Sequence, residues 1–222
     1  MSMDLSMLVR NVLWNGMLAV IPVILAQVVL WLSGMHGSRT IRNLAIAALS
    51  LVWFAFLPNT CYLLTEWRHF LFWVDVRDPF TSPRLGGPLL EKIVAMSVFY
   101  LLYSGFGMLT FALAIRPMKY LASKRGAAVR FWAIPFFTAL SIGVYLGLVL
   151  RFNTWDLISR PGMVWSALVD LGGRARLLAF ILAFGLFLWG AYETTDIWID
   201  GLKERWNRIT GQERRICSDR ES

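Results

Sequence analysis

The sequence has few charged residues for its length. Of 222 residues, 16% are charged and 57% are hydrophobic, whereas a soluble domain has about 25% charged and 45–50% apolar residues. The hydrophobic residues also lie in long uninterrupted runs, which favours membrane-spanning helices over a large soluble core. The alternating strands of about 10 residues that would indicate a transmembrane β-barrel are missing.

Patterns that carry well-known chemistry are also missing. Only two histidines and two cysteines are present, and neither a Gly-x-Ser-x-Gly signature nor a glycine-rich phosphate loop occurs. The predicted topology puts Cys61 and Cys217 on opposite membrane faces, where they cannot form a disulfide. No repeat or low-complexity tract is visible. The sequence therefore favours one compact domain with no metal and no other cofactor.

The hydrophobic runs predict an all-α fold. We expect a single integral membrane domain over residues 1–222, a polytopic bundle of about five transmembrane helices with additional interfacial amphipathic helices. At ~1.5 Å per residue, each run covers most of a hydrocarbon core about 30 Å thick. The spans are predicted at residues 12–33, 41–58, 93–115, 131–150 and 177–195.

Three further segments have the pattern of helices at a membrane surface. Residues 61–74 place Tyr62, Glu66 and His69 on one helical face, and residues 161–171 form a second candidate for a short interfacial helix. Residues 196–222 are predicted to be a cytoplasmic amphipathic helix followed by a charged tail.

The positive charge of the chain indicates its orientation. In a soluble protein a net charge of +8 would suggest a nucleic-acid partner, but here the basic residues lie in short loops between apolar runs. We therefore expect a lipid bilayer and no nucleic acid as partner. The loop over residues 116–130 has five basic residues and no acid. Since basic loops favour the cytoplasm, the N-terminus is predicted outside and the C-terminus inside.

Two polar stretches close the second and fourth apolar runs, on the same side of the membrane. Ionisable groups at membrane depth are costly and persist where something pairs with them. Arg151 has Asp156 and Glu66 as possible partners. We therefore expect an outward-facing ligand site with the following candidate residues: Asn59, Tyr62, Thr65, Glu66, His69, Arg151, Asn153, Trp155 and Asp156.

A purely structural reading of these residues is also open. Residues 58–60 can end one helix and cap the next, and Asn153 with Asp156 resembles a capping pair. Glu66 and His69 have the spacing of one carboxylate-bundle metal motif, but such bundles use two. In the fourth span, Gly143 and Gly147 form a small-residue stripe for helix packing. Arg151 continues that stripe and is expected to point at a neighbouring helix.

The same stretches resemble a known family. The motifs Leu-Pro-Asn-x-x-Tyr, at residues 57–62, and Arg-x-Asn-(Ser/Thr)-Trp-Asp, at residues 151–156, together with Trp14-Asn15, Ile21-Pro22 and Gly143 to Gly147, are similar to the family called domain of unknown function 1361. That family usually has Asp at the position of Glu66 and Arg at the position of Leu148. The resemblance implies a multi-pass protein of the bacterial inner membrane and implies no activity.

Three functions remain open on the sequence. The first is binding or translocation of a small polar or anionic solute or a lipid headgroup, with Arg151 holding the anionic group. The second is an enzyme acting on a lipid-linked substrate, with His69 and either Glu66 or Asp156 as acid and base. The third is an accessory subunit that packs on another membrane protein through Gly143 and Gly147. We favour the first, a protein without enzymatic activity.

Overall fold

The computed structural model describes residues 5–65, 87–124, 126, 129–152 and 156–210. Those residues form helices and short connections, and no strand occurs among them. The helices are α1 (Leu5–Gly34), α2 (Arg39–Phe56), α3 (Pro58–Thr65), α5 (Gly87–Lys124), α6 (Val129–Leu148), α7 (Asp156–Ser159), α8 (Pro161–Gly172) and α9 (Ala175–Ile209).

Five stretches of helix are long and apolar enough to cross a membrane. They cover Arg10–Gly34, Arg39–Leu64, Glu91–Lys124, Phe131–Leu148 and Ala175–Ile209. This confirms the all-α fold with five potential spans. Helix α8 also covers the segment that the sequence predicted as a short helix before the last span.

Two helices continue well beyond the C-terminal ends of their predicted spans. Helix α5 continues past residue 115 to Lys124, through Pro117, so most of the predicted basic loop is helical. Helix α9 runs without a break from Ala175 to Ile209 and joins the fifth span to the helix expected after it. The basic and acidic residues in these extensions pair with one another, as described below, which stabilises helix where a loop was expected.

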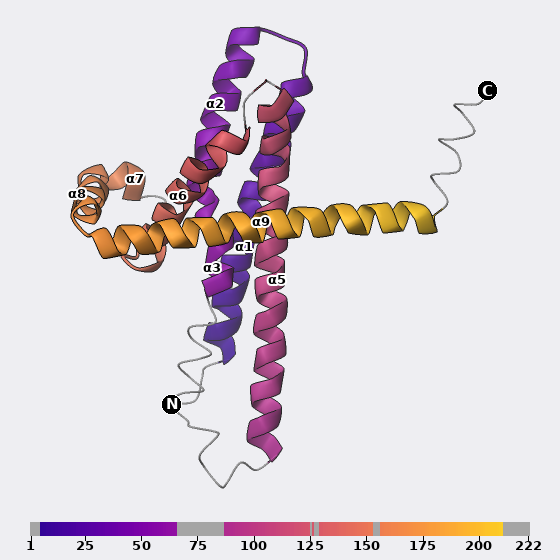
Figure 1. Ribbon diagram of the computed structural model, residues 1–222, viewed down its shortest axis with the longest axis vertical. Coiled ribbons are helices and arrows are strands. Elements are labelled where there is room, and N and C mark those ends of the chain that lie inside the picture. Colours follow the sequence, from indigo (N-terminus) through magenta and orange to yellow (C-terminus); the bar gives the residue numbers. More distant parts are fainter. Residues whose placement is uncertain (1–4, 66–86, 125, 127–128, 153–155, 211–222) are drawn as a thin grey trace.

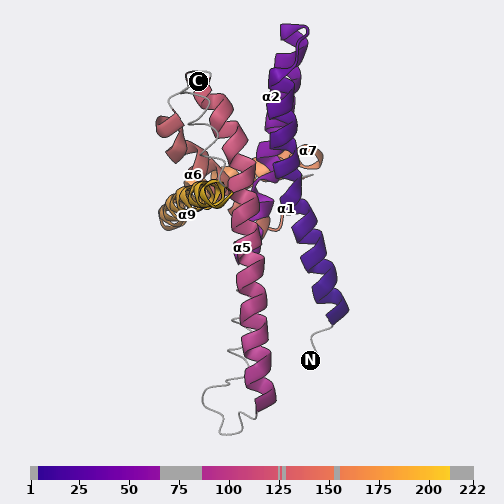
Figure 2. The ribbon, with the colours of Figure 1, turned by 90° about the vertical axis from the view of Figure 1, so that its right-hand side faces the viewer.

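The helices do not form a set of parallel rods. Helices α1 and α5 lie side by side, and α2 leads down into α3 beside them, whereas α9 runs across α5 (Figure 1). The second view shows α9 end-on while α5 stays upright (Figure 2). Two helices that cross so steeply cannot both stand along one membrane normal, so at least one of them is strongly tilted.

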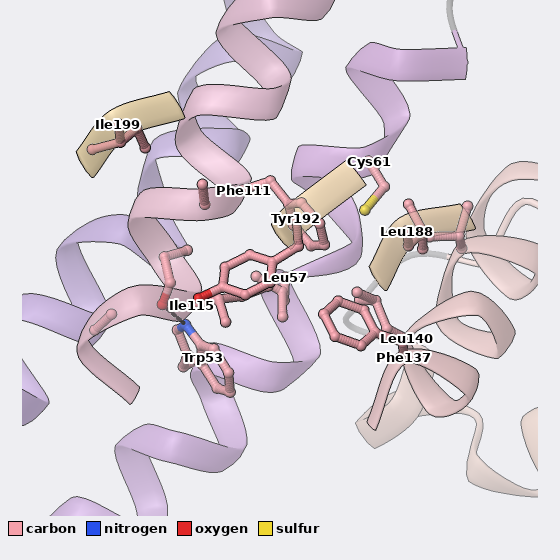
Figure 3. Close-up of a cluster of buried hydrophobic side chains, with 14 residues drawn as sticks. Trp53, Leu57, Cys61, Phe111, Ile115, Phe137, Leu140, Leu188, Tyr192 and Ile199 are labelled. Atoms are coloured by element: carbon pink, nitrogen blue, oxygen red, sulfur yellow. Dashed lines mark hydrogen bonds between the residues drawn. The ribbon is translucent and has the colours of Figure 1, made fainter. Parts of the chain in front are cut away.

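Aromatic side chains fill the space where α9 meets the other helices. Tyr192 of α9 lies 5.9 Å from Phe137 of α6 and 6.4 Å from Phe111 of α5 between ring centroids (Figure 3). Trp53 of α2 donates a hydrogen bond from Nε1 to the carbonyl oxygen of Ala114, at 3.1 Å. The main hydrophobic cluster therefore lies where α2, α5, α6 and α9 meet, and it extends to Ala26 of α1 and Cys61 of α3.

Helices α6 and α9 approach each other closely because of one glycine. A Cβ atom on Gly185 would lie 3.0 Å from the carbonyl oxygen of Phe137, closer than side-chain carbons normally come to a backbone. Ser141 Oγ donates a hydrogen bond of 2.8 Å to the carbonyl oxygen of Ile181 across the same contact. Small residues and interhelical hydrogen bonds are what hold helices together in lipid.

Candidate functional site

The first polar stretch begins where α2 breaks and α3 starts. Pro58 has no backbone N–H, so it fits the first position of a helix and ends the one before. The side chains that follow bind the carbonyl groups at the break. Asn59 Nδ2 donates to Phe56 O at 3.0 Å, and Thr60 Oγ1 donates to Leu57 O at 2.7 Å. Asn59 and Thr60 therefore have a structural role at this site.

Helix α3 lies inside the protein. Leu57, Thr60, Cys61 and Leu63 are fully buried, and α3 contacts α1, α5 and α6. Residues 61–74 were expected to form a helix along the membrane surface. For the described part, up to Thr65, this expectation is wrong, because three neighbouring helices surround it.

Glycines allow α3 to sit this close to its neighbours. A Cβ on Gly107 of α5 would lie 2.7 Å from Leu63 Cβ and 3.1 Å from the carbonyl oxygen of Thr60. A Cβ on Gly143 of α6 would lie 2.9 Å from Pro58 Cγ, and one on Gly147 would fall on the hydroxyl group of Tyr62. The glycine stripe of α6 thus faces α3 of the same chain.

This contact brings parts of the two polar stretches together. Pro58 and Tyr62 belong to the first motif, and Gly143 and Gly147 lead directly to the second. The contact also bears on the accessory-subunit hypothesis, since the face that was to meet another protein is covered by α3.

Arg151 lies just beyond the end of α6 and has an unusual backbone. Its φ angle is 58°, and it is the one residue other than glycine with a positive φ in the described part of the chain. The helix ends at Leu148, and the N–H of Phe152 closes the turn on the carbonyl oxygen of Leu146 at 3.0 Å. Because the helix has ended, Arg151 does not continue the glycine stripe. Its side chain is exposed and does not point into a neighbouring helix, as the sequence had suggested.

The other candidate residues are only partly described. Asp156 is the first residue of α7, and its Oδ1 accepts a hydrogen bond from Ser159 Oγ at 3.4 Å. No ion pair joins Asp156 to Arg151 in the described part of the chain. Thr65 ends α3, but its side chain is outside the description. Glu66, His69, Asn153 and Trp155 lie outside the described residues.

A second charged cluster, which the sequence analysis did not single out, lies where α5 and α9 cross. Arg116 Nε lies 2.6 Å from Asp196 Oδ1, and the same guanidinium also pairs with Asp200. Lys119 Nζ lies 3.1 Å from Asp196 Oδ2 and 3.5 Å from Glu193 Oε1. The Arg116–Asp196 pair is the least exposed, at 19% and 16% of the side-chain surfaces.

The sequence did contain a signal for this cluster. Glu193, Asp196 and Asp200 are spaced by three and four residues, which puts all three on one face of a helix. Arg116 and Lys119 are spaced by three. Complementary charges at helical spacing at the C-terminal ends of two predicted spans indicate an interhelical contact, whereas the basic pair by itself indicates only topology.

Metal ligation has no candidate in this part of the chain. Among the described residues, no three side chains of His, Cys, Asp or Glu lie close enough together to hold a metal ion.

The fold and the polar contacts define a multi-pass helical membrane protein. Comparison with protein families then identifies the chain more closely. A family model described as a protein of unknown function, DUF1361, matches residues 14–190, and the chain belongs to this family. The match confirms the resemblance carried by the two motifs. No match was found among curated proteins or among solved structures.

Proposed function

We propose that this protein binds or translocates a small polar or anionic solute, or binds a lipid headgroup, where the end of α3 meets the end of α6. The proposed site combines Tyr62 of α3 with Arg151 and Asp156, which follow α6. Asn59 and the candidates that lie outside the described residues complete it, and Arg151 supplies the positive charge.

The backbone of Arg151 is the observation on which this proposal rests. A left-handed conformation costs a residue with a Cβ about 1–2 kcal/mol, and glycine would adopt it without that cost. Residues held in such conformations concentrate at functional sites. An exposed arginine at this position, four residues after the glycine that packs against Tyr62, can offer its guanidinium to an anionic group.

The arrangement around Arg151 supports the same proposal. Gly147, four residues before Arg151, packs against Tyr62, so the segment that carries the guanidinium follows directly on a close contact between two helices. Sites that are fixed by packed helices hold their ligands with a smaller loss of conformational entropy. An arginine side chain in this setting can bind a phosphate or carboxylate group through two parallel hydrogen bonds.

The proposal can be tested by thermal unfolding of the purified protein with inorganic phosphate, glycerol phosphate and phosphoethanolamine as probes. We expect at least one probe to raise the unfolding temperature of the wild type, because a ligand that binds only the folded state stabilises it. Arg151→Gln should abolish that shift. Arg160→Gln is the matched control, since it removes the same charge from the same segment and should leave the shift unchanged.

A further variant separates the role of the side chain from that of the backbone. Arg151→Gly relieves the left-handed strain and should leave the protein at least as stable as the wild type, with no response to the probe. If Arg151→Gln and Arg160→Gln respond to all three probes as the wild type does, the proposed site is wrong.

We also propose that the protein lies in the inner membrane of a bacterium, with its N-terminus outside and its C-terminus in the cytoplasm. The segments after the first, third and fifth spans contain 13 Lys and Arg residues, against nine in the segments on the opposite side, and this bias supports the orientation. Fusing alkaline phosphatase and green fluorescent protein to each terminus tests it. An active phosphatase at the C-terminus would reverse the assignment.

A further inference from the structure

A cavity of about 830 Å³ lies between α2, α5, α6 and α9. Its size falls within the range of about 300–1,000 Å³ that is typical of ligand pockets. Most of its walls are apolar, with prominent contributions from Trp53, Met118, Trp132, Phe136 and Trp189. Trp53 and Phe136 stack at 6.0 Å between ring centroids, with 13° between the ring planes, so this part of the wall is nearly flat. The cavity is separate from the contact between α3 and α6.

One buried hydroxyl group in the cavity wall lacks a hydrogen bond of normal geometry. Tyr192 is 2% exposed, and within the described residues its hydroxyl makes no well-oriented hydrogen bond, although the Asp196 carboxylate lies close to it. The hydroxyl end of its ring lies on the side of Ile115 and Trp53, which also line the cavity (Figure 3). Asp196, one turn further along α9, has its Oδ1 against Arg116 Nε. Buried hydroxyl groups normally have a hydrogen-bond partner, so a ligand that accepts a hydrogen bond would complete this site.

The two charged groups of the cavity wall lie close together. Lys119 and Glu193 both line it, with 3.5 Å between Nζ and Oε1. Lys119 Nζ also lies 4.9 Å from the centre of the Tyr192 ring, and Trp189 Nε1 donates to Glu193 Oε1 at 3.2 Å. The cavity thus has an apolar body with one cation and one anion side by side.

We propose that this cavity binds a zwitterionic phospholipid of the surrounding membrane. The acyl chains would lie along the aromatic walls, with the phosphate beside Lys119 and the ammonium group beside Glu193. The Tyr192 hydroxyl would donate to an oxygen of the lipid.

The charges of the neighbouring cluster favour a zwitterionic lipid over an anionic one. Arg116 and Lys119 are two cations, whereas Glu193, Asp196 and Asp200 are three anions. The cluster has no excess of positive charge with which to attract an anionic headgroup. A zwitterionic headgroup matches it because it brings a cation as well as an anion.

Native mass spectrometry of the full chain in detergent can measure the affinity directly. The probes are phosphatidylethanolamine, phosphatidylcholine and phosphatidylglycerol with identical dioleoyl chains. We expect both zwitterionic lipids to bind about fivefold more tightly than phosphatidylglycerol, the effect of one favourable ion contact near a surface. Equal affinity for all three lipids would show ordinary solvation by lipid and would overturn the proposal.

Variants then locate the binding. Ala133→Trp places a large ring in the cavity and should abolish binding of phosphatidylethanolamine, whereas Ala139→Trp, an exposed position on the same helix, should have no effect. Tyr192→Phe removes only the hydroxyl and should weaken binding about fivefold. Glu193→Gln should reduce the preference for zwitterionic lipids, and Glu204→Gln, further along α9, should not.

The outcomes also separate this site from the one at Arg151. Arg151→Gln should leave lipid binding in the cavity unchanged, because the two sites share no residue. Unchanged binding in both Ala133→Trp and Tyr192→Phe would place the lipid elsewhere on the protein and refute the assignment.

Discussion

The packing of α3 and the crossing of α5 with α9 bring helices together in opposite ways. Around α3, the Cβ positions of Gly107, Gly143 and Gly147 would all lie within 3 Å of a side-chain atom of α3, so these glycines leave no room for a larger residue. At the crossing, Arg116 and Asp196 reach across between the helices, and a cavity of about 830 Å³ lies beside them.

The difference shows two ways in which helices can be held together within a membrane. Helices in lipid are not driven together by burial of apolar surface, because the lipid is as apolar as they are. Close contact through glycines gains dispersion energy, which is lost as soon as an atom is added. Contact through long charged side chains keeps the backbones further apart, which leaves space for another molecule, and it is lost when a charge is removed.

The largest effect is expected from adding atoms to the α3 contact. Gly107→Leu would force side-chain atoms into the backbone of α3 near Thr60 and should lower the free energy of unfolding by about 3 kcal/mol, at the upper end for overpacking. Gly105→Leu is the control on the same helix, since nothing lies near its Cβ position. Unfolding in mixed detergent micelles measures both. Equal stability of the two variants would mean that α3 does not pack against α5 in this way.

A smaller effect is expected at Gly147, because a side chain opposes it there. A Cβ on Gly147 would overlap the Tyr62 hydroxyl and lie 2.6 Å from Tyr62 Cζ. Gly147→Ala should cost about 2 kcal/mol. Adding Tyr62→Leu, which shortens the opposing side chain, should recover at least half of that loss. Additive losses in the double variant would show that the two residues do not touch.

The sequence predicted which segments are helices far better than how they pack. Length and hydropathy of the five runs are enough to identify potential spans, because lipid leaves few alternatives to a helix. The glycines at 143 and 147 were also recognised as a packing stripe. Their partner could not be predicted, because spacing within α6 says nothing about which helix faces it.

The burial of α3 and the direction of α9 could not be predicted from the local sequence of either segment. Residues 61–65 have polar neighbours that suggest a surface helix, and only the contacts with α1, α5 and α6 decide otherwise. The left-handed backbone of Arg151 could not be predicted either, since the amino acids at residues 148–152 contain no signal for the end of α6. In each case a contact between distant segments overrides the local pattern.

At the crossing of α5 and α9, removing a charge should lower the free energy of unfolding more than adding an atom does. Asp196→Asn leaves Arg116 and Lys119 with fewer acidic partners, and Arg116 is only partly exposed. We expect a loss of about 1–2 kcal/mol, below the 3–5 kcal/mol for a fully buried pair. The reciprocal Arg116→Gln should cost a similar amount, and a double-mutant cycle of the two should show coupling above about 0.5 kcal/mol.

The smallest effect is expected from an exposed ion pair with the same chemistry as the Arg116–Asp196 pair. Arg208 and Glu204 form a pair at 2.6 Å on α9, and their side chains are 64% and 62% exposed. Pairs of this kind on a helix surface contribute about 0.3–0.5 kcal/mol. A double-mutant cycle of Arg208→Gln and Glu204→Gln should therefore give a coupling that falls toward zero in 1 M salt, whereas the Arg116–Asp196 coupling should mostly persist, because its groups are less accessible to ions. If both couplings were equal and equally sensitive to salt, burial would not distinguish the two pairs, and the crossing of α9 over α5 would need another source of stability.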